Sequence, residues 1–410
     1  MEAPASIDLA KHVLLAAGVV LAAGILSGFA AQKLKVPDVV VLLLVGIGIG
    51  PAALGLVDIK ADSALNQLIL IFGSSYILFD GGASLRFEVL KRVWISITVL
   101  ATLGVLVTAV ITALAAFYFL HLPWLVALLL GMAIASTDPA TLVPIFRQIR
   151  IRDRVAQTVM SESAFNDATG AIGTFAVLAI AAGGEFVPGA ALGELVKQAG
   201  IGMVLGGVLG YAAALLIAHE KFSFLVEYAP VITLMAVIGA YLGADGMQAS
   251  GFMAVFVFGM VLGNKEFFGF RMEPGEARRL DEYVLTTAFV MRSFIFILLG
   301  AQVDFALMNQ HLVGGVLVVV IFMLVARPVA VFLCAAPDRR AKWTLPELVF
   351  MCWTRETGVI PAALAGLLLG MKAPGAEVVA SVTFIAVLMT ILIQATTTRW
   401  LARRLGLLLP

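Results

Sequence analysis

Long apolar runs separated by short polar segments extend over the whole chain. A helix needs roughly 20 mostly apolar residues to cross a membrane, and thirteen runs have about that length. These runs lie at about 10–31, 38–57, 65–84, 93–120, 123–147, 156–182, 195–218, 225–243, 247–263, 282–303, 310–335, 346–369 and 375–401. Because the connections between them are short, we expect an all-α polytopic membrane protein of about 13 transmembrane helices, in which residues 1–410 form one membrane domain.

The basic residues predict the orientation of these spans. With the N-terminus outside, one side of the membrane holds 20 Lys and Arg residues, the other side holds 4, and 3 lie inside spans, which accounts for all 27. Cytoplasmic loops of membrane proteins carry the excess of Lys and Arg. The bias therefore predicts thirteen spans with the N-terminus outside and the C-terminus in the cytoplasm.

Composition supports this class and excludes others. The chain is 61% hydrophobic and 13% charged, against about 25% charged in a typical globular protein, and its mean hydropathy is +1.05. A net charge of +1 excludes a nucleic-acid binder that works by bulk electrostatics. The two cysteines, Cys334 and Cys352, lie in apolar runs, so neither a disulfide framework nor a cysteine-rich metal site is expected.

Three pairs of spans share sequence features, and each pair is seven spans apart. Spans 2 and 9 both end in glycine-rich apolar sequence, spans 3 and 10 carry an apolar stretch that ends in glycine, and spans 5 and 12 are both interrupted by polar residues. An odd offset gives the two copies opposite orientations, as in secondary transporters with inverted repeats. We expect inverted repeats at approximately 33–182 and 247–405.

Eight ionisable residues lie deep inside predicted spans, although a charge at the bilayer centre costs a few kcal/mol. They comprise five acids and three bases: Asp80, Asp138, Glu162, Asp167, Glu356, Arg292, Arg327 and Arg355. The excess of acids requires a cation or protons for neutralisation. This excess points to cation handling.

The densest polar cluster lies in span 6. Ser163 and Asp167 are four residues apart, as are Glu162 and Asn166, so each pair shares a helix face. Asp167, Ser163 and Asn166 offer hard oxygen ligands suited to an alkali cation, and the carboxylate of Asp167 could instead hold a proton. The alternative is a packed polar patch between helices.

Span 5 is expected to break at Thr137-Asp138-Pro139, because proline removes a backbone donor and disfavours helix in the preceding residue. Carbonyls freed near Thr137 would then be available as ligands. Asp138 can cap the second half-helix, and we favour this role for Asp138 over direct contact with an ion. The alternative for the whole segment is a simple proline kink.

Span 12 carries Arg355 and Glu356 at the matching position, ahead of Gly358 and Pro361. In two crossing broken helices, Asp138 and Glu356 would offset positive helix ends, and Arg355 would offset a negative end. A local ion pair between Arg355 and Glu356 explains the sequence equally well.

Two further charges remain open at this stage. Asp80, before two glycines in span 3, suits either an entry ligand at the cytoplasmic end or a helix-end cap. Arg327 has no acid in its own span, so it needs a partner elsewhere.

These residues resemble the cation/proton antiporter superfamily, and in particular its NhaP/NHE branch, over essentially the whole chain. The most specific motifs are Thr137-Asp138-Pro139, Glu162-Ser163 with Asn166-Asp167, Ala326-Arg327-Pro328, and Arg355 ahead of Pro361. The resemblance implies an NhaA-like antiporter fold with two crossing broken helices, and a dimer that moves a six-helix core like an elevator. The core includes spans 5, 6, 12 and 13, at approximately 123–182 and 346–401, and the other spans mainly serve dimerisation or scaffolding.

The resemblance also implies roles for individual residues. Asp167 would bind Na⁺ (or Li⁺) and H⁺ in turn, with Ser163 and Thr137 as further ligands. Asn166 would organise the site, and Glu162 would pair with Arg327 as a structural bridge.

Two residues depart from the family pattern. Glu356 stands where glycine is usual, and Arg292 stands in span 10, where no base is expected in this branch. Arg292 could pair with an acid of the ion site, or it could bind backbone carbonyls.

We therefore expect a Na⁺(Li⁺)/H⁺ antiporter of a prokaryotic inner membrane, a homodimer with no cofactor and no enzymatic activity. Exchange would be electroneutral if Asp167 acts alone. The alternatives are a K⁺/H⁺ antiporter and a sodium-coupled symporter of organic solutes. An intramembrane aspartyl protease has little support, since Asp245 near a span edge is poor evidence for a catalytic aspartate.

Overall fold

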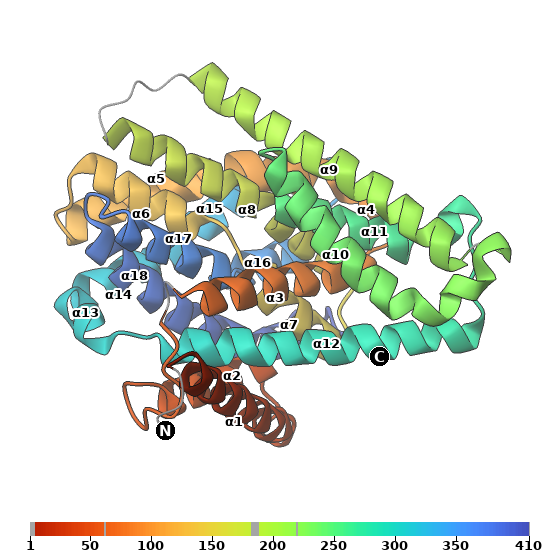
Figure 1. Cartoon of the computed structure of the whole chain (residues 1–410). Coiled ribbons are helices and arrows are strands. Elements are labelled where there is room, and N and C mark those ends of the chain that lie inside the picture. Colours follow the sequence, from red (N-terminus) through yellow and green to blue (C-terminus); the bar gives the residue numbers. More distant parts are fainter. Residues whose placement is uncertain (1–4, 61–62, 182–187, 219, 410) are drawn as a thin grey trace.

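The computed structural model describes residues 5–60, 63–181, 188–218 and 220–409, and all its named elements are helices (Figure 1). Those of the N-terminal half are α1 (Ala5–Leu34), α2 (Asp38–Ile49), α3 (Ala64–Ala83), α4 (Phe87–Val99), η1 (Leu100–Gly104), α5 (Val105–Phe119), α6 (Trp124–Ala135), α7 (Pro139–Gln148), α8 (Asp153–Ala181) and α9 (Pro188–Ala218). The next are η2 (Glu220–Tyr228), α10 (Ala229–Gly246), α11 (Gly251–Gly263), η3 (Lys265–Phe268), α12 (Pro274–Ala301) and α13 (Phe305–Gln310). The last are α14 (Leu312–Ile321), η4 (Phe322–Ala326), α15 (Arg327–Cys334), α16 (Leu345–Trp353), α17 (Val359–Gly370), α18 (Ala376–Met389), η5 (Thr390–Ala395) and α19 (Thr396–Arg404).

Each of the thirteen predicted spans corresponds to helix in the described part of the chain. Nine continuous helical stretches there are long and apolar enough to cross a membrane, and α2, α6, α11 and α17 are shorter apolar helices. Some predicted boundaries differ from the structure: α2 ends at Ile49 and not near residue 57, and α12 begins at Pro274 and not near residue 282. Pro51 cannot continue a helix, and residues 50–60 form turns and irregular backbone.

The packing of α2 on α12 resembles the packing of α11 on α3. A Cβ atom on Gly46 of α2 would collide with the backbone carbonyl of Ile297 on α12, and one on Gly259 of α11 would collide with that of Phe79 on α3. If each span is replaced by the span it matches, 2 by 9 and 10 by 3, the contact of α2 with α12 becomes the contact of α11 with α3. Two more close approaches correspond in the same way. The contact of Gly50 with Ala301 corresponds to that of Gly263 with Ala83. The contact of Gly300 with Leu43 corresponds to that of Gly82 with Phe256.

Spans 4 and 11, which are also seven spans apart, share one feature. Each is a long helix that widens into one π-helical segment, at η1 in span 4 and at η4 in span 11. These segments contact each other's helices, since η1 packs on α15 and η4 packs on α5. Insertions of this kind occur often at functional sites, and η4 also contacts α16, half of the second broken helix.

Apolar side chains cover the outer helices. In Figure 1, α1 and α9 lie at opposite edges of the bundle. Leu14 and Leu26 on α1 and Val204 and Val208 on α9 are exposed by 59–74%. Such a surface suits lipid or another subunit, and it leaves the polar residues of α6, α7, α8, α16 and α17 in the interior.

Candidate functional site

The two broken helices meet at their breaks. The first interruption, at residues 136–138, separates α6 from α7, and the second, at residues 354–358, separates α16 from α17. Pro139 opens α7, which fits the preference of proline for the first helical position. The backbone N–H of Asp138 donates to the backbone carbonyl of Glu356 at 3.0 Å. This hydrogen bond joins the two breaks directly.

The carboxylate of Asp138 reaches across to the other broken helix. It accepts the backbone N–H of Val359, the first residue of α17, at 2.8 Å, and the hydroxyl of Thr141 at 3.1 Å. A Cβ atom on Gly358 would collide with this carboxylate. The acid therefore stabilises a positive helix end, and glycine leaves the room for it. The sequence predicted a cap for α7 and did not indicate the partner on α17.

Asn166 fixes Thr137 at the first break. The backbone N–H of Thr137 donates to Oδ1 of Asn166 at 3.0 Å, and Nδ2 of Asn166 donates to Oγ1 of Thr137 at 2.8 Å. The side-chain amide of Asn166 thus uses its acceptor and one of its donors on a single residue of the break, Thr137. The organising role that the resemblance implied for Asn166 stays a prediction, and these two hydrogen bonds give it a structural basis.

Asp167 lies beside this contact and is only 3% exposed, yet within the described part of the chain neither of its carboxylate oxygens has a hydrogen-bond partner. The hydroxyl oxygens of Ser163 and Ser136 are also buried and without a partner. Ser136 and Asp138 lie close enough to Asp167 to act on its charge. Buried polar groups are normally satisfied, so these oxygens fit a small cation as cargo.

Ser136 is a residue that the sequence analysis did not assign to the site. It is the C-cap of α6 and stands directly before Thr137 and Asp138. Its position next to the predicted break was the available signal. Its hydroxyl adds a neutral oxygen to the group around Asp167.

The ion pair implied between Glu162 and Arg327 is present. Both residues are buried, and the two guanidinium nitrogens Nη1 and Nη2 donate to the two carboxylate oxygens at 2.6 and 2.7 Å. The third donor, Nε, reaches the carbonyl of Met351 at 3.0 Å. The pair joins α8 to α15 and α16 and satisfies two charges that would be costly alone.

Arg355 and Glu356 do not form the local ion pair that the sequence allowed. Both carboxylate oxygens of Glu356 are buried, and no residue that the structure describes forms a hydrogen bond with them. The guanidinium of Arg355 instead lies 5.0 Å from the ring centre of Phe322, and its Nη1 is 3.5 Å from Oγ1 of Thr108. The pair does not form because consecutive side chains in non-helical backbone diverge.

Asp80 pairs with Arg147, the basic residue in the last turn of α7. Its Oδ1 takes the ion pair, and its Oδ2 has no hydrogen-bond partner. The sequence suggested an entry ligand or a helix-end cap for Asp80, and neither role includes Arg147 as its partner. The side chain of Asp80 projects from the last turn of α3 toward Arg147 on α7, the second half of the first broken helix.

Arg292 pairs with Asp38, a partner that the sequence did not indicate. Its Nη2 lies 3.2 Å from Oδ2 of Asp38, at the start of α2. The sequence analysis omitted Asp38 because its position at the edge of a span looked like an ordinary helix start. The partner is neither an acid of the Asp167 site nor a backbone carbonyl.

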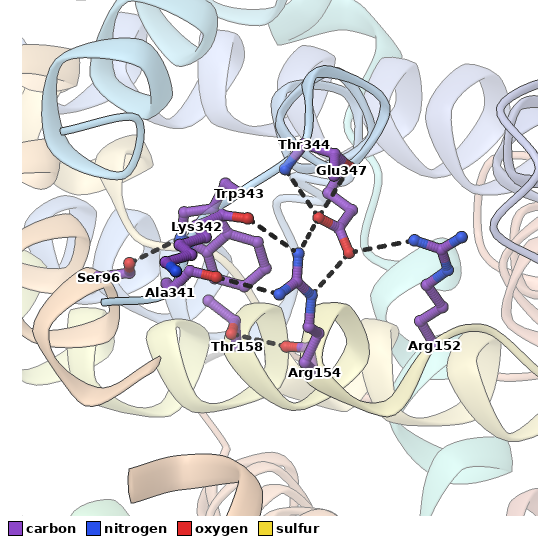
Figure 2. Close-up of polar contacts among 9 residues, drawn as sticks. All are labelled: Ser96, Arg152, Arg154, Thr158, Ala341, Lys342, Trp343, Thr344 and Glu347. Atoms are coloured by element: carbon purple, nitrogen blue, oxygen red, sulfur yellow. Dashed lines mark hydrogen bonds and ion pairs between the residues drawn. The ribbon is translucent and has the colours of Figure 1, made fainter. Parts of the chain in front are cut away.

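A second polar cluster fixes the starts of the two site helices α8 and α16, as Figure 2 shows. Nε of Arg154 on α8 donates to Oε1 of Glu347 on α16 at 2.7 Å, and Arg152 lies 3.6 Å from the same oxygen. Glu347 also accepts the backbone N–H of Thr344 at 2.9 Å. The guanidinium of Arg154 stacks on Trp343 at 4.9 Å.

The cluster continues to α4 through a loop aspartate. Trp343 donates to Ser96 at 2.8 Å, and Ser96 donates to Asp338 at 2.6 Å. Burial alone would raise the pKa of Asp338, but the hydrogen bonds from Ser96 and from two backbone N–H groups hold it below its usual value. This chain of contacts ties α4, α8 and α16 together at one end.

The chain matches known exchangers over nearly its full length. Residues 18–404 match the family described as sodium/hydrogen exchanger, transmembrane. The chain is 33% identical over 359 residues to Na(+)/H(+) antiporter 1 of Methanocaldococcus jannaschii, covering 85% of this chain and 81% of that protein. It is 29% identical over 410 residues to the K(+)/H(+) antiporter NhaP of Alkalimonas amylolytica, covering 97% and 67%.

Solved structures give the same result. The sodium proton antiporter MjNhaP1 of Methanocaldococcus jannaschii at pH 8 superposes with a TM-score of 0.71 at 29% identity, over 93% of this chain and 99% of that chain. An electron-microscopy structure of MjNhaP1 superposes with a TM-score of 0.77, also at 29% identity, over 100% of both chains. This chain is a multi-pass membrane protein that belongs to the sodium/hydrogen exchanger family.

Proposed function

We propose that this protein exchanges Na⁺ (or Li⁺) for H⁺ across the inner membrane of a prokaryote. The observation that carries the proposal is the buried carboxylate of Asp167, which has no protein partner among crossed helix breaks. The relatives named as Na⁺/H⁺ antiporters support the same reaction.

Competition for Asp167 explains the coupling. An unpartnered carboxylate in a low-dielectric interior needs either a bound cation or a proton, and one carboxylate cannot hold both. Asp167, Ser163 and Thr137 would bind the cation, while Asn166 positions Thr137. Because each cycle carries one positive charge in each direction, exchange is electroneutral with 1:1 stoichiometry.

The helix packing suggests which parts move. We assign the repeats to 33–182 and 247–405, and the site-bearing helices at 123–182 and 346–401 to a core that moves against the remaining scaffold. The exposed apolar faces of α1 and α9 suit lipid and the partner subunit of a homodimer. The N-terminus lies outside and the C-terminus in the cytoplasm, in agreement with the distribution of Lys and Arg.

K⁺/H⁺ exchange is the second candidate, and a specific observation favours it. One relative covered over 97% of this chain is named as a K⁺/H⁺ antiporter. Neutral hydroxyl oxygens at Ser136, Ser163 and Thr137 accept either cation, so donor type does not separate the two reactions.

A proteoliposome assay tests both candidates. Purified protein is reconstituted with an imposed pH gradient, and the decay of this gradient is followed with a pH-sensitive dye after addition of Na⁺, Li⁺ or K⁺. The proposal predicts decay with Na⁺ and Li⁺ and weak decay with K⁺. Decay with K⁺ alone would establish the second candidate, and decay with none of the three would refute cation exchange.

A further inference from the structure

A pocket of about 470 Å³ lies between α1, α2 and α12 on one side and the ends of α7 and α19 on the other. It is separate from the Asp167 site. Its volume is within the range of roughly 300–1,000 Å³ that small-molecule sites occupy.

Three bases and one acid line this pocket. The bases are Lys35, Arg292 and Arg399, and the acid is Asp38, so the local formal charge is +2. The amides of Gln32 and Gln148 add neutral donors. Among the described residues, neither Lys35 nor Arg399 forms an ion pair. Two positive charges therefore face the pocket without a protein counter-charge.

Arg292 distinguishes this pocket from the basic loops that are common on the cytoplasmic side of membrane proteins. An excess of Lys and Arg on the cytoplasmic side explains Lys35 and Arg399, but Arg292 lies within span 10, where a base is costly. Asp38 engages its Nη2, while its Nε is buried and has no hydrogen-bond partner. The sequence analysis identified Arg292 as a departure from the family, and the exchange mechanism at Asp167 does not use it.

The charge excludes a simple role in cation entry, since a net positive cavity lowers the local concentration of cations. It suits a dianion. A phosphate monoester carries about −1.5 to −2 charges at pH 7 and three acceptor oxygens, and guanidinium groups recognise phosphate through paired donors.

We propose that this pocket binds a phosphomonoester group that reaches it from the cytoplasmic side. The group belongs either to a soluble phosphate compound or to a lipid headgroup such as that of phosphatidic acid. Bound there, it bridges α1, α2 and α12 to the ends of α7 and α19. Because α7 is half of a broken site helix, the bridge restrains the motion that exchange requires and slows transport.

Binding is tested on purified full-length protein in detergent by thermal unfolding. One arm adds glycerol 3-phosphate, a soluble phosphomonoester, as its Tris salt, against Tris chloride of equal ionic strength, so that Na⁺ is absent throughout. The other arm adds mixed micelles of phosphatidic acid, against phosphatidylcholine. The variants are Arg399→Gln and Lys35→Gln, both at exposed positions, and the matched control is Arg404→Gln, on the same helix but outside the pocket.

We expect one of the probes, or both, to stabilise the wild type and Arg404→Gln. The apparent affinity for that probe should be about tenfold lower in Arg399→Gln and Lys35→Gln. A response to glycerol 3-phosphate alone identifies a soluble ligand, and a response to phosphatidic acid alone identifies the lipid. The proposal is overturned if neither probe stabilises the protein, or if Arg404→Gln loses as much affinity as Arg399→Gln. Since the readout is binding, the result does not depend on which cation is exchanged.

Discussion

Asn166 holds Thr137 by two reciprocal hydrogen bonds, of 3.0 Å to the backbone N–H and 2.8 Å to the side-chain hydroxyl. The amide is buried on α8, one residue before Asp167, and Thr137 belongs to the break between α6 and α7. A single side chain therefore holds the break next to the carboxylate of Asp167.

Replacement of Asn166 should impair cation binding more than folding. Asn166→Ala removes both hydrogen bonds and leaves the N–H of Thr137 buried without a partner, which costs about 1–3 kcal/mol. We expect an apparent Na⁺ affinity about tenfold weaker, measured by exchange in proteoliposomes. Thr174→Val is the control, because the buried hydroxyl of Thr174 on the same helix only donates to the carbonyl of Gly170. Unchanged affinity in Asn166→Ala would contradict the organising role.

The Glu162–Arg327 pair should govern stability and not selectivity. Either Glu162→Gln or Arg327→Gln leaves one buried charge unpaired, which typically costs about 3–5 kcal/mol. Each single variant should therefore unfold at a clearly lower temperature, and the double variant should recover part of the loss. Thermal unfolding of the three proteins in detergent measures this coupling. Strictly additive losses would show that the two residues are not energetic partners.

The matched glycine contacts predict which glycines tolerate a side chain. Gly46→Ala and Gly259→Ala each place a methyl group against a backbone carbonyl, at Ile297 and Phe79 respectively. Overpacking of this kind costs about 1–3 kcal/mol, and the two variants should lose similar stability. Gly48→Ala is the matched control, because no heavy atom lies within 4 Å of its added Cβ. Equal thermal stability of Gly46→Ala and Gly48→Ala would count against the close packing of α2 on α12.

Arg292→Gln should destabilise the protein without shifting the pH profile of exchange. Its ion pair with Asp38 at 3.2 Å is the contact that the substitution breaks, and Asp38 is not an acid of the Asp167 site. Asp38→Asn in the same protein should restore part of the stability, because it removes the unpaired acid. Exchange measured from about pH 5 to 9 checks the profile, and a marked shift in Arg292→Gln would mean that this base acts on the transported ions.

Sequence reasoning found the helices and the breaks because both depend on local chemistry. Apolar length predicts a span, and the Asp138-Pro139 step predicts a break wherever it occurs in a helix. The early end of α2 has a local cause in Pro51 that the apolar count overlooked. The cluster on α8 was also visible, since Ser163 and Asp167 share a helix face through their spacing.

The partners of the charged residues depended on long-range packing, which sequence spacing does not encode. Asp138 reaches Val359 across 221 positions, and Arg147 reaches Asp80 across 67. Arg355 and Glu356 looked like a local pair because they are adjacent, but unwound backbone separates their side chains. The resemblance supplied the Glu162–Arg327 pair, which no periodicity within α8 could have indicated.

Competition at Asp167 is the central claim, and Asp167→Asn tests it most directly. The exchange of Na⁺ for H⁺ is measured in proteoliposomes for the wild type, Asp167→Asn and the control Asp245→Asn, which changes an exposed acid on α10. We expect exchange to be lost in Asp167→Asn alone, with thermal stability retained, because the amide needs neither a proton nor a cation. In the wild type, the apparent affinity for Na⁺ should weaken as the pH falls, because protons occupy the same carboxylate. Substantial exchange by a folded Asp167→Asn protein, or a wild-type Na⁺ affinity that does not change with pH, would contradict the claim.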